Sequence, residues 1–540
     1  MKNKKLIVFF FALSMFFTGA SGLVNEYVLS TVSTYILGNS IEQFSITIAV
    51  MLGFMGLGGF VQKFISDRNL ISKFLTLEFS LAIFGGFAPL AIYASFVYFE
   101  DHFILIQYFF ISIIGFLVGF EIPFIIRINE SYSDNLKKNL SVIMSADYIG
   151  SLVGAFVWVY LLLPYIPLTK ISFIISGVNL VVAIITVLYL ERNWKTYLFS
   201  FIAVALLSVG YAYSDKISIN LEQKLYKDKV LYSTTTKYQH LVITKNSKVN
   251  DIRLYINGNT QFSSLDENIY HENLVHPIMS LVKNHKNVLV LGGGDGMAVR
   301  EIKKYNDVNS ISLIDLDPAM VQLAKTNPIL SKLNHHSFDN VKVYKPSFLV
   351  DSDERKDIFK DKKYLASVNV YHIDADKMLH NIMNKGIKWD VIIIDFPDPS
   401  TVELAKLYSR EFYLKIKKIL APGGMFVVQS TSPYHAKESY LCIGRTIQAA
   451  GFDTLAYHDN VPSFGDWGWW IGWNPDDKRD ISHDINHIKF DINTTYLTEN
   501  KFKSNTFFGK GWLTAKHNDI NTLMFPKLLD LYTKNSWLYY

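Results

Sequence analysis

The sequence predicts two structural classes in one chain: an α-helical multi-pass membrane domain, followed by a doubly wound α/β domain that begins with a small β element. Three observations support this prediction. Residues up to about 213 form a series of apolar runs, the composition becomes that of a soluble protein from about Asp215, and apolar strand patterns then alternate with helical ones. The predicted segments are 1–213 for the membrane domain, 214–264 for the β element, 265–480 for the α/β domain and 481–540 for a C-terminal extension.

The composition sets outer limits on these classes. With 540 residues, 50% hydrophobic and 15% aromatic side chains, and a mean hydropathy of +0.17, the chain is too long for one ordinary domain and too apolar to be wholly soluble. Its formal charge of +5 is spread along the chain, so no basic patch indicates a nucleic-acid partner. The single cysteine, Cys442, has no partner for an internal disulfide or a zinc site and is expected to be buried.

Seven apolar runs predict seven membrane spans, because most of them approach the ~20 residues that cross a bilayer. The runs are residues 6–22, 44–62, 74–99, 103–126, 140–163, 171–190 and 196–213. Lysines precede the first run as they do in a secretory signal, but further apolar sequence follows from Tyr27 to Leu37. We therefore expect a retained anchor and a multi-pass protein of the cell membrane.

The orientation in the membrane has two solutions. If the seven runs alternate, almost all lysines and arginines of the connections fall on one side, and the positive-inside rule places the N-terminus in the cytoplasm. An odd number of crossings then places the C-terminal half outside. Alternatively one run does not cross, and Leu6 to Leu37 is the first candidate for this. The sequence leaves both arrangements open.

Four carboxylates lie inside or beside the predicted spans: Glu26, Glu78, Glu121 and Asp147. A carboxylate at membrane depth is costly, so each is a candidate for contact with a cationic ligand, the alternative being a position at a membrane interface. The glycine-rich stretch 53–59 instead indicates close packing between helices.

A small β element is predicted before the main α/β fold. Residues 238–243 and 252–256 alternate in the manner of strands, and Asn257-Gly258 is a strong hairpin signal. Five apolar strands follow, separated mostly by helical patterns, which favours a largely parallel sheet. These strands are expected at 288–291, 311–315, 368–373, 390–395 and 425–430.

A glycine-rich loop, Gly292–Gly296, joins the first of these strands to a helix expected from Met297. Open α/β sheets bind ligands at the carboxyl ends of their strands, where glycine lets the backbone approach a ligand closely. Dehydrogenases and methyltransferases share such loops, but Asp315 also ends the second strand, where a carboxylate can accept both hydroxyls of a ribose. Asp295 would repel the pyrophosphate of a dinucleotide and suits a cationic sulfonium or ammonium ligand. Of the two classes that share such loops, the Rossmann-like fold of methyltransferase type is therefore favoured over a dinucleotide-binding dehydrogenase.

Two more carboxylates, Asp395 and Asp398, stand three residues apart at the mouth of the fourth strand. An amine is unreactive while it is protonated, so transfer of a group to a polyamine requires a base that takes its proton and further negative charge that holds the cation. The two side chains suit that division of tasks. Taken alone, the segment is equally consistent with a solvated turn made by Asp and Pro.

The joint order and spacing of these motifs resemble the spermidine synthase family of polyamine aminopropyltransferases over residues 230–475. The resemblance rests on Tyr270-His271-Glu272 with His276-Pro277, the Gly292–Gly296 loop, Asp315, Asp374-Ala375, Asp395–Pro399, and Leu420–Gly424 leading into Gln429. The apolar N-terminal half, together with 407–413 and 461–468, is similar to the bacterial branch in which such a domain is fused to membrane spans.

The resemblance implies a reaction and a role for each motif. Decarboxylated S-adenosylmethionine is the implied co-substrate, an amine such as putrescine the acceptor, and methylthioadenosine and spermidine the products, with no metal or other cofactor. Asp395 matches the general base of an in-line displacement at the carbon next to the sulfonium. The positions matching the nucleoside site are Gln239, Asp315, Asp374 and Ala375, and those matching the groups that hold the aminopropyl chain or the amine are Tyr270, His271, Asp295 and Asp398.

The chain departs from the family's pattern mainly on the acceptor side. Asp315 stands where Glu is usual, Pro397 replaces a Thr, and Ser463 and Phe464 replace a pair of tyrosines. The identity of the amine is therefore less certain than the nucleoside site.

Three further segments are interpreted more broadly. Residues 327–367, which include the charge-rich run 351–363, are expected to form a solvated insertion. Four tryptophans between 467 and 473 either wall the acceptor pocket or form a buried strand. The extension 481–540 carries no motif with an interpretation.

Two other functions stay open on the sequence. A methyltransferase that uses intact S-adenosylmethionine shares the fold and the glycine loop, although Asp295 would crowd the donor's carboxylate. A polyamine-binding membrane sensor or transport protein without catalysis is favoured by the spans and the altered acceptor residues. The sequence also leaves open whether the chain forms a homo-oligomer.

Overall fold

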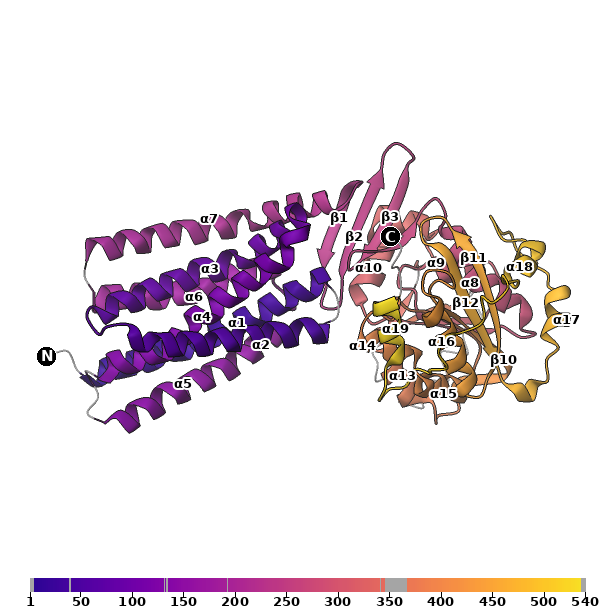
Figure 1. Cartoon of the computed structure of the whole chain (residues 1–540). Coiled ribbons are helices and arrows are strands. Elements are labelled where there is room, and N and C mark those ends of the chain that lie inside the picture. Colours follow the sequence, from indigo (N-terminus) through magenta and orange to yellow (C-terminus); the bar gives the residue numbers. More distant parts are fainter. Residues whose placement is uncertain are drawn as a thin grey trace. The chain divides into compact units, whose positions relative to one another are not determined.

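The computed structural model describes residues 4–37, 40–130, 132, 135–191, 193–339, 341–344 and 367–535. The chain divides into two compact units, Met1–Lys229 and Val230–Tyr540. Figure 1 shows that the first unit is a bundle of long helices, while the second combines strands and shorter helices. The charge-rich run 351–363, predicted as part of an insertion, lies outside the described residues.

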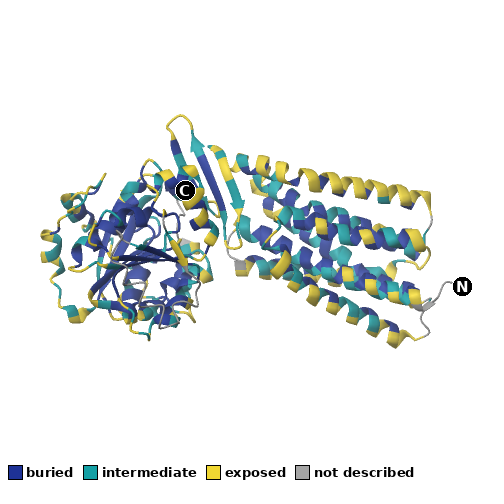
Figure 2. Cartoon of the chain, turned by 180° about the vertical axis from the view of Figure 1, so that it is seen from behind, coloured by how far each residue is buried: buried dark blue, intermediate teal, exposed yellow. Residues whose placement is uncertain are grey.

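Seven long helices form the described part of the first unit. They are α1 (Lys4–Leu37), α2 (Ser40–Val61), α3 (Leu70–Tyr98), α4 (Phe103–Glu130), α5 (Leu136–Val157), α6 (Leu168–Tyr189) and α7 (Trp194–Leu225). All seven are long and apolar enough to cross a membrane. Figure 2 shows exposed residues along the outer helices of the bundle, and the exposed side chains of α7 include Phe199 and Phe201.

Two helices extend beyond the runs that predicted them. The run 6–22 continues as one helix to Leu37, and hydroxyl side chains in the added part are satisfied within the helix: Ser30 Oγ donates to Glu26 O (2.8 Å) and Ser33 Oγ to Leu29 O (2.8 Å). Helix α7 passes residue 213 and ends at Leu225. The segment predicted as a β element from 214 therefore begins with three turns of helix.

Glycines bring the helices of the bundle into close contact, as the sequence predicted for the stretch 53–59. A Cβ at Gly58 of α2 would collide with the carbonyl oxygen of Phe116 in α4, and one at Gly119 would collide with that of Met55. By contrast, nothing lies within 4 Å of a Cβ added at Gly53. The close approach therefore uses only part of the predicted stretch.

The carboxylates of the bundle are not equivalent. Glu78 and Glu121 are buried at 0% and 2% exposure, and both oxygens of Glu78 and one of Glu121 have no hydrogen-bond partner among the described residues. Glu26 and Asp147 are half-buried. Glu78 and Glu121 thus face the interior of the bundle, and both alternatives from the sequence, contact with a cationic ligand and a position at a membrane interface, stay predictions.

A four-stranded antiparallel sheet follows the bundle, in the order β1-β2-β3-β4. Its strands are β1 (Lys229–Thr235), β2 (His240–Asn246), β3 (Asp251–Ile256) and β4 (Asn259–Ser263). The predicted hairpin is confirmed: Asn257 and Gly258 have φ values of 50° and 82°, as a two-residue turn of this kind requires.

The main sheet has eight strands in the order β11-β12-β10-β9-β5-β6-β8-β7. They are β5 (Asn287–Gly292), β6 (Ser310–Ile314), β7 (Lys342–Tyr344), β8 (Ser367–Tyr371), β9 (Trp389–Asp395), β10 (Leu420–Gln429), β11 (Asp453–Val461) and β12 (Gly465–Trp473). The run from β10 to β7 is parallel, and β12 is antiparallel to both of its neighbours. The five predicted strands are confirmed, and the tryptophan segment is the buried strand β12.

Helices cover both faces of this sheet, so that two separate cores form. Val288 and Val290 of β5 belong to one core, and the alternate residues Leu289 and Leu291 to the other. Figure 2 shows the buried strands between the two layers. The helices are α8 (Glu267–Leu281), α9 (Met297–Ile302), α10 (Pro318–Thr326), α11 (Pro328–Leu333), α13 (Ala375–Ile382), α14 (Val402–Ala405), α15 (Arg410–Ile419), α16 (Lys437–Ala449), α17 (Ile481–Asn486), α18 (Glu499–Asn505) and α19 (Lys527–Asn535).

The start of the predicted insertion 327–367 is regular structure, which corrects that prediction for its described part. Asn327 caps α11 through its side chain, Pro328 occupies the first helical position, and Leu330 and Phe338 are fully buried in the core. Apolar side chains that pack against the sheet therefore anchor the beginning of this connection.

Candidate active site

The glycine-rich loop brings the ends of three strands together. Gly292, the last residue of β5, lies opposite Asp395 of β9 in the parallel register, and a Cβ there would collide with the carbonyl oxygen of Asp395. A Cβ at Gly294 would stand 2.5 Å from Asp315 Oδ2. Gly296 has φ +82° at the start of α9, in the left-handed region that glycine tolerates. The loop therefore allows the carboxylates that follow β6 and β9 to approach the end of β5.

Asp295 lies within this loop and is buried. Its Oδ1 accepts the backbone N–H of Met297 (2.9 Å) at the start of α9. Its negative charge acts on His271, Asp315 and Asp395. The structure thus gathers acidic groups from three strand ends around one loop.

Asp395 combines one fixed oxygen with one open oxygen. Tyr270 Oη donates a hydrogen bond of 2.6 Å to Asp395 Oδ1, while the buried Oδ2 has no hydrogen-bond partner among the described residues. Burial and the charge of Asp295 raise the pKa of Asp395 to about 6, against the opposing effects of His271 and Tyr270. A carboxylate with this geometry is oriented and can still take up a proton.

Aromatic rings hold Tyr270 in place. Its ring centroid lies 5.7 Å from that of Trp469 and 5.9 Å from that of Phe464. Burial and the charge of Asp395 raise the pKa of Tyr270 well above its ordinary value, so its hydroxyl stays a donor. Trp469 therefore belongs both to the buried strand β12 and to the packing behind the site, and Phe464 packs against the other side of Tyr270.

His271 is held by a buried chain of charges. Its Nδ1 lies 2.8 Å from Glu267 Oε2, and the Arg300 guanidinium contacts both oxygens of Glu267 at 2.7 and 2.8 Å. Burial lowers the pKa of His271, but the hydrogen bond to Glu267 and the charges of Glu267, Asp295 and Asp395 raise it above its usual value. These buried ion pairs hold His271 where the charges of Asp295 and Asp395 act on it.

Asp398 is half-buried and follows Asp395 by three residues. Its Oδ2 accepts a hydrogen bond from Tyr532 Oη (2.8 Å) and its Oδ1 one from Gln429 Nε2 (3.3 Å). Burial raises the pKa of Asp398 to about 6, although the hydrogen bonds from Tyr532 and Gln429 lower it. Tyr408 Oη donates to the carbonyl oxygen of Pro397 (3.1 Å), which fixes the segment between the two carboxylates.

The proposed ribose side contains one residue more than the sequence predicted. Gln239 Nε2 donates to Asp317 Oδ2 (2.9 Å), which also accepts from Thr236 Oγ1 (2.7 Å). The backbone N–H of Asp317 in turn donates to Asp315 Oδ1 (2.8 Å). Gln239 thus reaches Asp315 through Asp317, and burial raises the pKa of Asp315 to about 7.

Asp374 and Ala375 follow β8, the neighbour of β6 in the sheet. Asp374 Oδ1 caps α13 by accepting from Lys377 N (3.0 Å), and its Oδ2 pairs with Lys406 Nζ at 2.6 Å. Burial raises the pKa of Asp374, but these hydrogen bonds outweigh it and lower the pKa below the ordinary value. Its carboxylate is therefore engaged by the protein, unlike the open oxygen of Asp395, and Ala375 is buried beside it.

A possible metal-ligand group lies elsewhere in this unit but is fully engaged by protein. Ligand atoms of Glu272, His276 and Glu301 lie within 4.8 Å of one another. Glu272 accepts three backbone N–H groups from Thr495 to Leu497 at 2.5 to 2.9 Å, and His276 bonds to Glu301 and Tyr305. These contacts explain the group as a structural junction that ties the C-terminal extension to α8.

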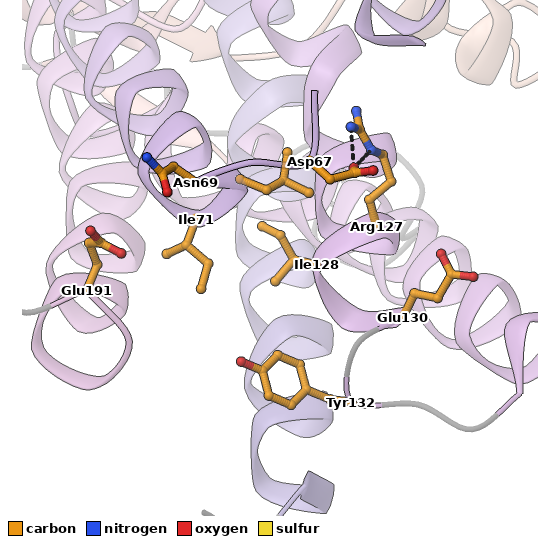
Figure 3. A pocket seen from close by; sticks show the side chains of 9 residues that line it. Asp67, Asn69, Ile71, Arg127, Ile128, Glu130, Tyr132 and Glu191 are labelled. Atoms are coloured by element: carbon orange, nitrogen blue, oxygen red, sulfur yellow. Dashed lines mark hydrogen bonds and ion pairs between the residues drawn. The ribbon is translucent and has the colours of Figure 1, made fainter. Parts of the chain in front are cut away.

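A cavity of about 600 Å³ lies in the helical unit and contains none of the residues predicted to act in transfer. Its lining residues are Asp67, Asn69, Leu70, Ile71, Arg127, Ile128, Glu130, Tyr132 and Glu191. Figure 3 shows Arg127 turned toward Asp67 at one end of the cavity, and the two form an ion pair. The pair neutralises part of the acidic lining that Glu130 and Glu191 extend.

Sequence reasoning did not identify several residues of the site. Asp317 carried a signal, because Asp-Pro at a helix start predicts a cap, but nothing in the sequence indicated that it would pair with Gln239, which the resemblance had already placed in the nucleoside site. Glu267 and Arg300 lie 33 positions apart and meet only in the fold. Tyr532 lies in the extension for which no motif was found.

The fold and site fit a transferase that binds a cationic nucleoside at the carboxyl edge of a Rossmann-like sheet. Residues 267–483 match the sequence profile of the spermine/spermidine synthase domain. The polyamine aminopropyltransferase of Oceanobacillus iheyensis is 35% identical over 95% of this chain and 94% of that protein, and that of Leptospira interrogans is 37% identical over 88% and 90%. The chain belongs to this family of polyamine aminopropyltransferases.

Solved structures include a spermidine synthase in complex with the transition state analogue AdoDATO. That chain is 22% identical to this one, with a TM-score of 0.42 over 56% of this chain and 90% of the solved one.

The raised pKa values of Asp395 and Asp398 predict how transfer depends on pH. The resemblance gives Asp395 the role of a base and Asp398 that of a cation-holding group, both of which require a negative carboxylate, and each has a pKa of about 6. As the pH falls through about 6 they become protonated. We therefore expect kcat/KM for the amine to fall about tenfold or more for each pH unit below about 6. Initial rates between about pH 5 and pH 8 check this, and a profile without a bend near 6 would contradict it.

Proposed function

We propose that this aminopropyltransferase moves the aminopropyl group of decarboxylated S-adenosylmethionine to an amine such as putrescine, giving spermidine and methylthioadenosine. The observation that supports this most directly is the state of Asp395. It is buried among negative charges at the carboxyl edge of the sheet, oriented by Tyr270 and open at Oδ2. This is the arrangement that a base for a protonated amine requires.

The reaction follows from these positions. Asp395 takes a proton from the attacking ammonium group, which leaves a neutral nitrogen with a lone pair. That lone pair attacks the carbon next to the sulfonium while the carbon–sulfur bond breaks and its electrons return to sulfur. The positive charge on sulfur disappears, methylthioadenosine leaves as a neutral thioether, and the proton on Asp395 passes to solvent. The protein's part is to position both substrates and to make the nucleophile neutral, without a metal or another cofactor.

The donor's positive charge accounts for the acidic surroundings. In this proposal Asp315, supported through Asp317 by Gln239, binds the ribose hydroxyls, and Asp374 and Ala375 line the adenine side. Asp295 faces the sulfonium or the terminal ammonium of the aminopropyl group. Burial and, to a smaller extent, repulsion from neighbouring carboxylates raise the pKa values of Asp315 and Asp395, and a bound cation would relieve that repulsion.

The acceptor lies between Asp395 and Asp398 in this proposal. Tyr270 and His271 border that space from α8. Asp398 holds the distal ammonium of a diamine, while Asp395 deprotonates the near one. A diamine is favoured over a monoamine because the half-buried second carboxylate otherwise remains without a counter-charge.

We also propose that the first unit is inserted in the cell membrane through its seven helices. The exposed apolar side chains of α7 support this, because they have no partner in water. With seven crossings the catalytic unit lies on the side opposite the N-terminus. Resistance of the protein to alkaline extraction, and protease digestion of sealed vesicles, test insertion and side separately; a protein released by alkali would contradict insertion.

The activity is tested with the full chain purified in detergent. The protein is given decarboxylated S-adenosylmethionine and a panel of amines, and methylthioadenosine release is measured together with the product amine. We expect equal amounts of both products and the highest kcat/KM with a diamine. Methyl transfer from intact S-adenosylmethionine would instead show a methyltransferase, and amine binding without turnover would show a sensor or transport protein.

A further inference from the structure

The C-terminal extension returns to the end of β9, where Asp395 and Asp398 lie. Its last described helix, α19, packs Leu528 and Leu531 into the core that also contains Ile394 of β9 and Tyr408. Residues 528, 531 and 532 lie on one face of a helix, because they are spaced by three and four positions. The two buried leucines therefore turn Tyr532 toward the end of β9.

The segment before α19 is fastened independently. Asn521 Nδ2 donates to the carbonyl oxygen of Ala405 (2.7 Å), and Asn521 O accepts from the backbone N–H of Arg410 (2.9 Å). The backbone N–H of Asn521 also donates to Thr446 Oγ1 (2.9 Å). Asn521 is buried, so α19 starts from a fixed point on the catalytic unit.

Tyr532 completes the set of donors to Asp398. Its Oη donates to Oδ2 at 2.8 Å, while Gln429 Nε2 approaches Oδ1 at 3.3 Å. The hydrogen bond from Tyr532 is the shorter of the two. It fixes the rotation of the carboxylate and, by stabilising negative charge, favours the ionised form of the half-buried Asp398.

We propose that Tyr532 is a positioning residue of the amine site, which orients Asp398 and keeps it negative so that it can hold the distal ammonium group of a diamine. This inference rests on the aminopropyl transfer proposed above. It assigns a role to the extension 481–540, most of which lies beyond the segment 267–483 that matches the family profile. The chain thereby provides a phenol at the acceptor carboxylate from its C-terminus.

The variant Tyr532→Phe tests this role, since it removes the hydroxyl and keeps the ring. We expect the KM for putrescine to rise about tenfold, with a smaller change in kcat and an unchanged KM for the donor, because a hydrogen bond to a charged group is lost. We also expect the acid limb of kcat/KM for the amine to move to higher pH, because Asp398 loses a donor that lowers its pKa. A purely structural role would not shift that limb.

The matched control is Tyr496→Phe in the same extension. Tyr496 Oη donates to Asp459 Oδ1 (3.2 Å), outside the carboxylate cluster, so its loss should leave KM for the amine and the pH profile unchanged. Calorimetric titration of putrescine into native protein and Tyr532→Phe, with methylthioadenosine present, measures the amine site without turnover. Weaker binding by the variant supports the inference. Equal binding by the variant, or an unshifted acid limb, overturns the role of Tyr532 even if aminopropyl transfer is confirmed. Absence of transfer by the native protein contradicts only the proposed reaction.

Discussion

Replacement of Asp395 by Asn is expected to lower kcat by ~10²-fold or more while decarboxylated S-adenosylmethionine still binds. Asn keeps the shape of the side chain and can still contact Tyr270 Oη, but it cannot take a proton from the ammonium group of the acceptor. The attacking nitrogen then stays protonated and has no lone pair. Methylthioadenosine release under saturating substrates measures the loss, and calorimetric titration with the donor measures binding.

The same substitution at Asp376 provides the control. Asp376 pairs with Lys415 Nζ at 2.6 Å at the start of α13, away from the open oxygen of Asp395, and Asp376→Asn should retain native kcat. Equal turnover in the Asp395 variant would show that this carboxylate is not the base. A loss of donor binding in that variant would instead assign Asp395 to the nucleoside site.

Replacement of Arg300 by Met is expected to destabilise the catalytic unit by about 3–5 kcal/mol. Arg300, Glu267 and Glu301 are all buried, at 6%, 5% and 1% exposure, and the guanidinium contacts both carboxylates at 2.7 Å. Without it, Glu267 loses the guanidinium that contacts both of its oxygens and is less firmly held against His271, while Glu301 keeps only Lys304 and His276 as partners. Urea unfolding followed by tryptophan fluorescence checks this, because buried Trp469 reports on the core of this unit.

Arg410→Met is the matched control for the effect of burial. Arg410 is 44% exposed and lies 3.6 Å from Glu411, so its exposed ion pair should contribute less than about 1 kcal/mol. An Arg300 variant that unfolds at the same urea concentration as native protein would contradict a structural role for the buried chain. An Arg300 variant with native stability but altered amine binding would show that these buried ion pairs act in the acceptor site alone.

The elements that the sequence predicted well are those with a local signal. The strands β5, β6, β8, β9 and β10 were visible as short apolar runs, and the hairpin at Asn257-Gly258 as a turn that needs two left-handed residues. The glycine loop after β5 marked the ligand edge, because glycine is required where a backbone approaches its neighbours. Helix ends were less predictable: α1 and α7 extend beyond the apolar runs, since hydroxyl and polar side chains also continue a helix.

Site residues were predictable where a motif placed them directly after a strand. Asp295, Asp315 and Asp395 come close together because parallel strands end at the same edge. The contact between Gln239 and Asp317 joins residues 78 positions apart, and that between Asp398 and Tyr532 joins residues 134 positions apart. No local pattern encodes such pairs.

The sequence by itself determined the two classes of structure in this chain, the edge of the sheet that carries the chemistry, and the acidic character of that edge. Periodicity, turn residues and strand-end motifs are short-range properties, so the order of residues is sufficient to read them. Only the tertiary structure decided which oxygen of Asp395 stays open, which carboxylate Lys406 neutralises, and that the C-terminus provides a donor to Asp398. These depend on packing between distant segments, where the identity of a partner is set by the three-dimensional arrangement of the sheet and its helices.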